Sequence, residues 1–161
     1  MPVATRLASP QDLEEFRQYL RSGRDETTTC IAICAGTGCR ANGSMELFEE
    51  MRRQLDAEGL TDVEVRATGC HGFCEKGPLV VIHPQEIFYN GVQLSDVPAI
   101  IEKTLRKGEV VDSLLYRDPV TKQKCRLEGD VPFYAKEQRI VFRHNGTIDP
   151  TSIDDYIAAG G

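Results

Sequence analysis

Apolar residues recur every three or four positions in three stretches of the chain, which is the spacing of one buried helix face. The first stretch follows Ser9 and Pro10, a capping residue and a first-turn proline, and ends at Gly23. The second follows the capping residue Ser44. The three predicted helices therefore cover residues 9–23, 44–59 and 96–106.

Four short segments are instead rich in β-branched residues or alternate between apolar and polar positions, which is typical of strands. The last two are separated by His83, Pro84, Gln85 and Glu86, which predicts a hairpin. The predicted strands cover residues 27–33, 63–67, 79–82 and 87–89.

The order of these elements predicts an α/β fold. A strand, a helix and a second strand form a right-handed crossover unit, so the first two strands are expected to be parallel. The hairpin then adds an antiparallel pair. We therefore predict a four-stranded mixed sheet flanked by helices.

The pattern changes after Gly108. Residues 112–129 are polar and irregular, residues 139–143 predict one short strand, and residues 149–157 predict a short capped helix. This extended C-terminal tail has too few apolar residues for a core of its own. The expected organisation is an N-terminal helix in 1–26, a central domain in 27–108, and a linker with the start of a further domain in 109–161.

Composition narrows the class of protein. The chain has 161 residues, of which 40% are hydrophobic and 27% charged, a typical soluble composition. Its formal net charge of −6 argues against binding nucleic acid. No apolar run approaches the roughly 18 residues that span a bilayer, and residues 1–6 lack the features of a signal sequence. We therefore expect a cytoplasmic protein.

Four of the six cysteines form two pairs, Cys34-x4-Cys39 and Cys70-x3-Cys74. Each pair lies in a glycine-rich loop that directly follows a predicted strand. Because the loops after parallel strands emerge at the same end of a sheet, the fold is expected to bring the four thiols together.

An iron–sulfur cluster fits this arrangement, since thiolate is the ligand that such iron prefers. The cluster and its thiolates carry negative charge, so buried loops need donors that face the sulfurs. Glycines allow backbone N–H groups to approach sulfur without a Cβ clash. We expect this of Gly36, Gly38, Gly69 and Gly72, and we expect Phe73 to shield the cluster from water.

Other interpretations remain open. Four cysteines can bind structural zinc, although zinc sites favour tighter C-x2-C pairs. The cysteines could also form disulfides or a catalytic dithiol. Cys30 is expected to be a core residue and Cys125 a free thiol. His71, between two candidate ligands, could tune the cluster or replace a ligand.

Residues 34–44 (CAGTGCRANGS) and 68–78 (TGCHGFCEKGP) resemble the thioredoxin-like [2Fe–2S] ferredoxins. The resemblance covers residues 27–107. It implies a thioredoxin-like fold, a [2Fe–2S] cluster on Cys34, Cys39, Cys70 and Cys74, and one-electron transfer.

Residues 133–143 and 148–161 look like the join between such a ferredoxin domain and a flavoprotein domain. The join is found in NADH-binding beta subunits of electron-bifurcating hydrogenases, NAD-dependent formate dehydrogenases and complex I-like oxidoreductases. FMN, NADH and a [4Fe–4S] cluster would then belong to a remainder that is absent here. No catalytic residue is assigned to this chain.

This resemblance makes other flavin or iron–sulfur domains the expected partners, within a larger NAD(P)H-dependent oxidoreductase. Two alternatives stay open. One is a free-standing ferredoxin, which could form a homodimer, and the other is a metal-stabilised docking domain with no electron-transfer role.

Overall fold

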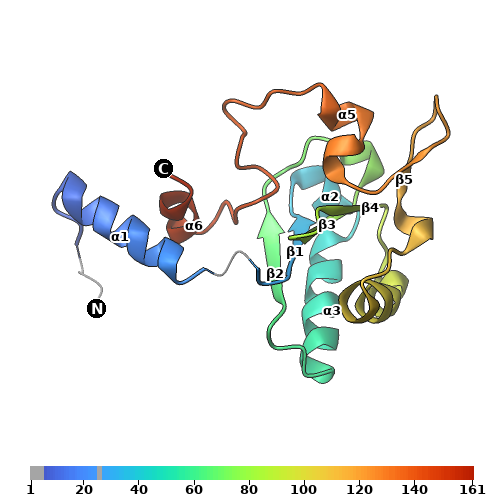
Figure 1. The fold of residues 1–161 in the computed structure, drawn as a ribbon, viewed down its shortest axis with the longest axis horizontal. Coiled ribbons are helices and arrows are strands. Elements are labelled where there is room, and N and C mark those ends of the chain that lie inside the picture. Colours follow the sequence, from blue (N-terminus) through green and yellow to red (C-terminus); the bar gives the residue numbers. More distant parts are fainter. Residues whose placement is uncertain (1–5, 25–26) are drawn as a thin grey trace.

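The centre of the molecule is a mixed sheet in the strand order β2-β1-β3-β4 (Figure 1). In the computed structural model, which describes residues 6–24 and 27–161, β1 pairs in parallel with β2 and antiparallel with β3. The predicted four-stranded mixed sheet is therefore confirmed. Its strands are β1 (Cys30–Cys34), β2 (Glu64–Thr68), β3 (Leu79–His83) and β4 (Ile87–Asn90). The prediction that residues 1–6 lack the features of a signal sequence falls mainly on residues 1–5, which lie outside the described residues.

The first two predicted helices are confirmed, with small differences at their ends. The structure has the α-helices α1 (Pro10–Ser22), α2 (Thr37–Ala41), α3 (Ser44–Ala57), α4 (Val97–Ala99), α5 (Pro132–Ala135) and α6 (Ile153–Ala158). The third predicted helix is irregular: α4 is a single turn, and Ile100–Arg106 continues it as a π-helix. None of the helices in the described part of the chain is both long and apolar enough to cross a membrane.

The start of α3 differs from the prediction. Ser44 is the first helical residue rather than the cap, and its buried hydroxyl has no hydrogen-bond partner among the described residues. The capping position belongs to Gly43, whose φ of 86° is left-handed. Glycine takes that conformation without a Cβ clash, which allows α3 to follow α2 so closely. By contrast, Ser9 caps α1 as predicted, because Asp12 N–H donates to its Oγ at 3.1 Å.

The sheet is covered on both faces. On one face, Ile31 and Ile33 of β1 pack with α3 and the π-helix in a core that also contains Leu47, Met51, Val80, Ile82, Tyr89 and Ile100. On the other face, Ala32 and Cys34 pack with Phe88, Tyr116, Cys125 and Val131. Each large aliphatic side chain buried in this way contributes about 1.5–3 kcal/mol. Cys30 is 6% exposed, which confirms its prediction as a core residue.

The second face is covered by residues that follow the π-helix. Residues 112–129, predicted to be irregular, include a two-stranded ribbon of β5 (Tyr116–Arg117) and β6 (Lys124–Cys125). The predicted strand at 139–143 is wrong, because these residues form bends and turns. Ile140, Val141 and Phe142 are largely exposed, and no described strand pairs with them. β-Branched residues favour a strand only where a partner completes the ladder.

The predicted C-terminal helix is present as α6, and it lies beside α1, away from the sheet (Figure 1). Arg17 Nε donates to the carbonyl of Ile157 at 3.0 Å, and Arg21 Nε donates to that of Ala158 at 2.7 Å. Cations at the C-terminal end of a helix also complement its dipole. The two ends of the described chain are therefore tied together.

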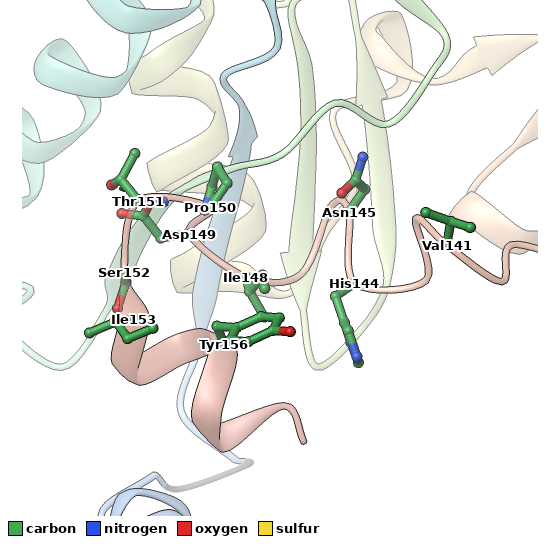
Figure 2. Close-up of a pocket in the computed structure, with 10 residues that line it drawn as sticks. All are labelled: Val141, His144, Asn145, Ile148, Asp149, Pro150, Thr151, Ser152, Ile153 and Tyr156. Carbon is green, nitrogen blue, oxygen red and sulfur yellow. Dashed lines mark hydrogen bonds between the residues drawn. The ribbon is translucent and has the colours of Figure 1, made fainter. Parts of the chain in front are cut away.

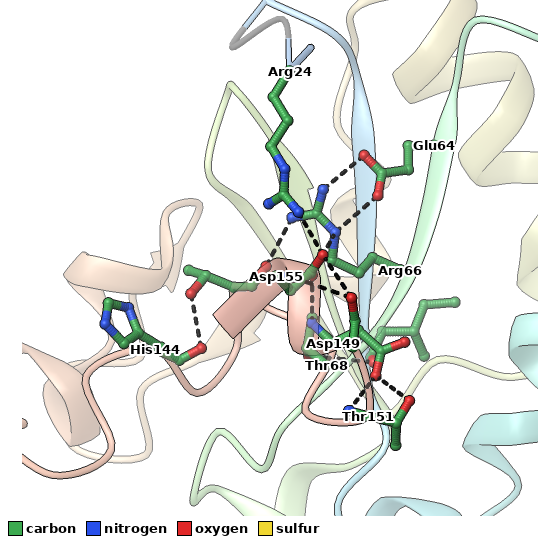
Figure 3. A network of polar contacts seen from close by, with 11 residues as sticks. Arg24, Glu64, Arg66, Thr68, His144, Asp149, Thr151 and Asp155 are labelled. Atoms are coloured by element: carbon green, nitrogen blue, oxygen red, sulfur yellow. Dashed lines mark hydrogen bonds and ion pairs between the residues drawn. The ribbon is translucent and has the colours of Figure 1, made fainter. Parts of the chain in front are cut away.

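Asp155 joins α6 to the rest of the molecule (Figure 3). Its carboxylate is paired with Arg24, accepts from Asp149 N–H at 2.9 Å, and lies 4.0 Å from Arg66 Nε on β2. Arg66 also donates to the carbonyl of Thr147 at 2.8 Å. Burial would raise the Asp155 pKa, but these hydrogen bonds and the arginine charges hold it below its ordinary value.

Candidate metal centre

The four paired cysteines lie at one end of the sheet. Cys34 is the last residue of β1, and Cys70 follows β2. Cys74 begins a short 3₁₀ turn, Cys74–Lys76. Cys39, which we expected in a loop, lies in the short helix α2. The helix places Cys39 back over the end of β1, so its side chain is fully buried.

The thiols approach one another as two pairs. Cys70 Sγ and Cys74 Sγ are 3.7 Å apart, and the side chains of Cys34 and Cys39 lie within hydrogen-bonding reach of each other. Within the described residues, no group of three or more Cys, His, Asp or Glu side chains surrounds a position for one metal ion. The pairs are instead brought together by the glycines between them.

Three glycines leave the space in which the cysteines meet. A Cβ on Gly36 would lie 2.7 Å from Cys70 Cβ and 3.0 Å from its Sγ. A Cβ on Gly38 would lie 3.3 Å from Cys74 Sγ. Gly77 is the most restricted, since its Cβ would lie 2.6 Å from Cys39 Sγ.

Sequence reasoning identified Gly36 and Gly38 but missed Gly77, although a glycine three residues after Cys74 and next to Pro78 is a usable signal. Gly72 has a φ of 91° and its N–H donates to Cys70 Sγ at 3.3 Å, as a sulfur-facing glycine would. Gly69 differs from these glycines, because a Cβ there would meet Asn145 at 3.1 Å rather than a sulfur.

The charge state of the inner pair is set by its hydrogen bonds. The Cys39 thiol lowers the pKa of Cys34, with further help from the backbone N–H groups of His71 and Gly36. The same contact raises the pKa of Cys39. Burial raises the pKa of Cys70. The backbone donors of His71 and Gly36 therefore favour the thiolate form of Cys34, which is the form that binds metal.

The two pairs differ in their access to solvent. Cys34 is 1% exposed and Cys39 is fully buried, whereas Cys70 is partly exposed and Cys74 is exposed. Anything held between the pairs would thus have one buried and one accessible side.

Aromatic rings surround the loop that carries Cys70 and Cys74. Phe73 is 6% exposed and stacks on Phe133 with ring centroids 4.5 Å apart and planes 3° apart. Tyr116 and Tyr134 meet the Phe73 ring edge to face. Together they exclude water from the inner side of the cysteines.

The hydroxyl of Tyr134 is buried with no hydrogen-bond partner among the described residues. Burial raises the Tyr134 pKa, and the charges of Glu128 and Cys34 add to the effect, whereas Arg139 lowers it.

His71, adjacent to Cys70, is 1% exposed and held on both ring nitrogens. Nδ1 lies 2.9 Å from Glu128 Oε1, and Nε2 lies 3.2 Å from Thr68 Oγ1. Burial would raise the Glu128 pKa, but the hydrogen bond from His71 and its charge keep it lowered. An ionised carboxylate can only accept, so Nδ1 is the donor. With both nitrogens engaged, the ring is fixed in place.

Residues from the C-terminal tail complete the site, and sequence reasoning missed them all. They are Glu128, Phe133, Tyr134, Arg139 and Asn145. They lie at least 54 positions after Cys74, and no local pattern marks contacts across such a distance.

Cys125 and the exposed Arg40 lie outside the site. Cys125, on β6, is a buried free thiol whose Sγ is 3.5 Å from the carbonyl of Asp130. All six cysteines are described, and none forms a disulfide. Arg40 donates to the carbonyl of Ala35 at 2.8 Å and is otherwise exposed.

Two hollows accompany the tail. One, of about 410 Å³, runs along residues 141–156 and contains no cysteine (Figure 2). The other, of about 330 Å³, lies against Cys70 and is bounded on the other side by Arg139, Phe142 and Asn145.

Residues 17–105 match the family model of the thioredoxin-like [2Fe–2S] ferredoxins. A "Ferredoxin, 2Fe-2S" of Clostridium pasteurianum is 38% identical over 95 residues, which are 52% of this chain and 91% of that protein. Its counterpart in Aquifex aeolicus is 35% identical over 79 residues, 48% of this chain and 71% of that protein.

The solved structure of a thioredoxin-like [2Fe–2S] ferredoxin from Aquifex aeolicus superimposes with a TM-score of 0.51 at 28% identity. The aligned part covers 53% of this chain and 87% of that one. The matched part of our chain holds all four paired cysteines, and the tail residues of the site lie beyond the family match.

Proposed function

We propose that this chain, which belongs to the thioredoxin-like [2Fe–2S] ferredoxins, holds its cluster on Cys34, Cys39, Cys70 and Cys74 and transfers single electrons to a partner protein. The observation that carries the ligand assignment is the meeting of two cysteine pairs in a space kept open by glycines.

Cluster chemistry fits the residues present. A [2Fe–2S] cluster takes two thiolates at each iron, which matches paired thiols rather than four around a single point. The Gly72 N–H, which donates to Cys70 Sγ, is a donor suited to a negatively charged group. When bound, the cluster supplies a centre that gains and loses one electron.

The chain's own residues then have separate tasks. Buried Cys34 and Cys39 anchor the inner side, and Phe73 with its stacked partner Phe133 excludes water there. Exposed Cys74 marks the side that a redox partner can approach closely. The low dielectric on the inner side and the donors around the sulfurs together set how readily an electron is accepted.

The partner is a flavin or iron–sulfur domain of an NAD(P)H-dependent oxidoreductase in the cytoplasm. This part of the proposal is supported by the resemblance of residues 133–143 and 148–161 to a ferredoxin–flavoprotein join. Hydride chemistry would belong to that partner.

Anaerobic purification tests the cluster. We expect a coloured protein with equal amounts of iron and acid-labile sulfide, and a rhombic electron paramagnetic resonance signal after reduction. A colourless protein that contains stoichiometric zinc would disprove the proposal.

Cysteine-to-serine variants test the ligands. Cys70→Ser should change or abolish the spectrum, because serine replaces a thiolate ligand with an oxygen. Cys125→Ser is the control, since Cys125 is another free thiol but is buried on β6, away from the paired cysteines. Equal spectra for both variants would contradict the ligand assignment.

Electron transfer is tested separately from cluster binding. In the intact parent oxidoreductase, Cys70→Ser should block the reduction of downstream centres by NADH. If turnover and internal electron transfer survive, the cluster has only a structural role, as in a metal-stabilised docking domain.

A further inference from the structure

A segment of the C-terminal tail closes over the loop that carries Cys70. We call residues 128–146 the clamp. They lie beyond residue 105, where the family match ends. The clamp contacts Cys70, His71 and Phe73 of this loop. Its Asn145 and Phe133 also lie where a Cβ on Gly69 or Gly72 would meet them. By contrast, the first cysteine loop is held from within the domain, by Arg40 and by Thr68.

The most informative contact is made by Arg139. Its Nη2 donates to the carbonyl of His71 at 2.9 Å. That carbonyl belongs to the same peptide group as the N–H of Gly72, and this N–H donates to Cys70 Sγ at 3.3 Å. A cation on the carbonyl side polarises a peptide and strengthens the hydrogen bond made by its N–H. Arg139 therefore acts on a ligand sulfur through one peptide group.

Asn145 repeats this arrangement one residue earlier. Its side chain points away from the neighbouring His144 (Figure 2), and its Nδ2 donates to the carbonyl of Cys70 at 3.1 Å. The N–H of that peptide belongs to His71 and is directed at Cys34, a member of the other cysteine pair. The clamp thus places a donor on the carbonyl of each of the two consecutive peptides that face cysteine sulfurs.

These donors are fixed rather than free. The Arg139 guanidinium lies 4.9 Å from the centre of the Tyr134 ring, and its Nε donates to Glu137 at 2.8 Å. Its side chain is 23% exposed. Because Glu137 offsets much of its charge at long range, Arg139 acts mainly through the peptide group that it contacts.

We propose that the clamp sets the reduction potential of the cluster, with Arg139 and Asn145 as positioning residues that polarise the two peptide groups facing the cysteine sulfurs. This inference rests on the proposed function, because it assumes a cluster on these ligands. Reduction adds negative charge to the site, so stronger donors favour the reduced form. Loss of either donor should therefore make the cluster harder to reduce.

The experiment is a spectroelectrochemical titration of the full chain carrying its cluster. Arg139→Gln should lower the equilibrium constant for reduction about tenfold, which is about 59 mV for one electron. Asn145→Ala, which removes a neutral donor, should lower it by roughly threefold. Arg143→Gln is the matched control: it removes the same charge from an exposed clamp residue whose only hydrogen bond within the described residues is to His144. We expect its effect to be much smaller.

Each outcome decides between the two proposals. A chain that binds no [2Fe–2S] cluster refutes the proposed function itself. A loaded wild-type chain whose Arg139→Gln and Asn145→Ala variants keep its potential refutes the clamp inference alone. An Arg143→Gln shift equal to that of Arg139→Gln also refutes it, because the effect would then be one of net charge.

Protein stability is a separate readout. If Arg139→Gln fails to fold or load, the Asn145→Ala titration decides, since this variant keeps the guanidinium contacts in place. Thermal unfolding of every variant shows whether a potential shift merely follows loss of structure.

Discussion

At the scale of single residues, the glycines around the cysteines determine what the site can hold. Gly36 and Gly77 have ordinary backbone angles, with φ of −64° and −71°, so any amino acid could adopt their conformation. They are needed for space, because a Cβ at either would lie within 3.0 Å of a cysteine side chain. Their role is therefore to leave room for the cysteine side chains rather than to bend the chain.

Gly36→Ala should reduce cluster content and destabilise the fold. The added methyl group would overlap Cys70, and overpacking of this kind costs about 1–3 kcal/mol. Iron content and the thermal midpoint measure the two effects. Gly23→Ala is the control, since Gly23 has a φ of −83° and its Cβ would have only ordinary contacts at 3.8 Å. If both variants bind equal amounts of iron, the space around Gly36 is not limiting.

At the scale of elements, the strands were predictable because their apolar patterns are local. β1 alternates Ile31 and Ile33 with Ala32 and Cys34, and the two sets face different cores. The strand predicted at 139–143 shows the limit of this reasoning. Its residues have high β-propensity, but the tail runs over the cysteine loop, where it makes side-chain contacts instead of a ladder.

The contact between α1 and α6 gives a prediction at this scale. The double variant Arg17→Ala/Arg21→Ala removes the side-chain donors to the last carbonyls of α6. Each charged hydrogen bond contributes about 1.5–3 kcal/mol at most. We expect amide exchange in residues 153–159 to rise roughly tenfold, a factor that corresponds to about 1.4 kcal/mol.

The matched control for this variant is Arg52→Ala/Arg53→Ala on α3. It removes the same charge from an exposed surface, where Arg53 pairs only with Glu50. Exchange in β1 to β4 should stay unchanged in both variants. Unchanged exchange in α6 would mean that apolar packing alone holds it against α1.

At the scale of the whole molecule, the main core is independent of the cysteines. It lies between the sheet, α3 and the π-helix, and no cysteine belongs to it. Only the smaller core on the opposite face contains Cys34 and Cys39. A cluster on the four paired cysteines would therefore sit at the edge of a domain that can bury apolar surface without it.

Removal of the cluster should leave the sheet folded. Anaerobic chelation of iron should preserve the far-ultraviolet circular dichroism spectrum, while amide exchange in residues 35–39 and 69–77 increases. Complete unfolding on chelation would contradict this view and would indicate a metal-dependent fold, as in small zinc domains.

The attachment of α6 should depend on pH through Asp155. A lowered folded-state pKa means that Asp155 adds stability above its ordinary pKa of 3.8, and that this stability is lost as the pH falls through the lower value. Thermal unfolding should show wild type more stable than Asp155→Asn at neutral pH, with the difference vanishing in acid. Asp154→Asn, an exposed neighbour on α6, should behave like wild type at every pH.

The sequence by itself determined the sheet, its two main helices and the convergence of Cys34, Cys39, Cys70 and Cys74. These follow from local periodicity and from one topological rule, that loops after parallel strands emerge at the same end. Such signals are contained within a few neighbouring residues or a single crossover unit.

Only the tertiary structure decided what surrounds the cysteines. The pairing of His71 with Glu128, and the donors Arg139 and Asn145 on the two sulfur-facing peptides, join residues 57 to 75 positions apart. The sequence next to those residues does not indicate the contacts, because they form only when the C-terminal tail packs over the loop that carries Cys70. The sequence thus indicated which thiols meet, and the folded tail decided the polarity of the site in which they meet.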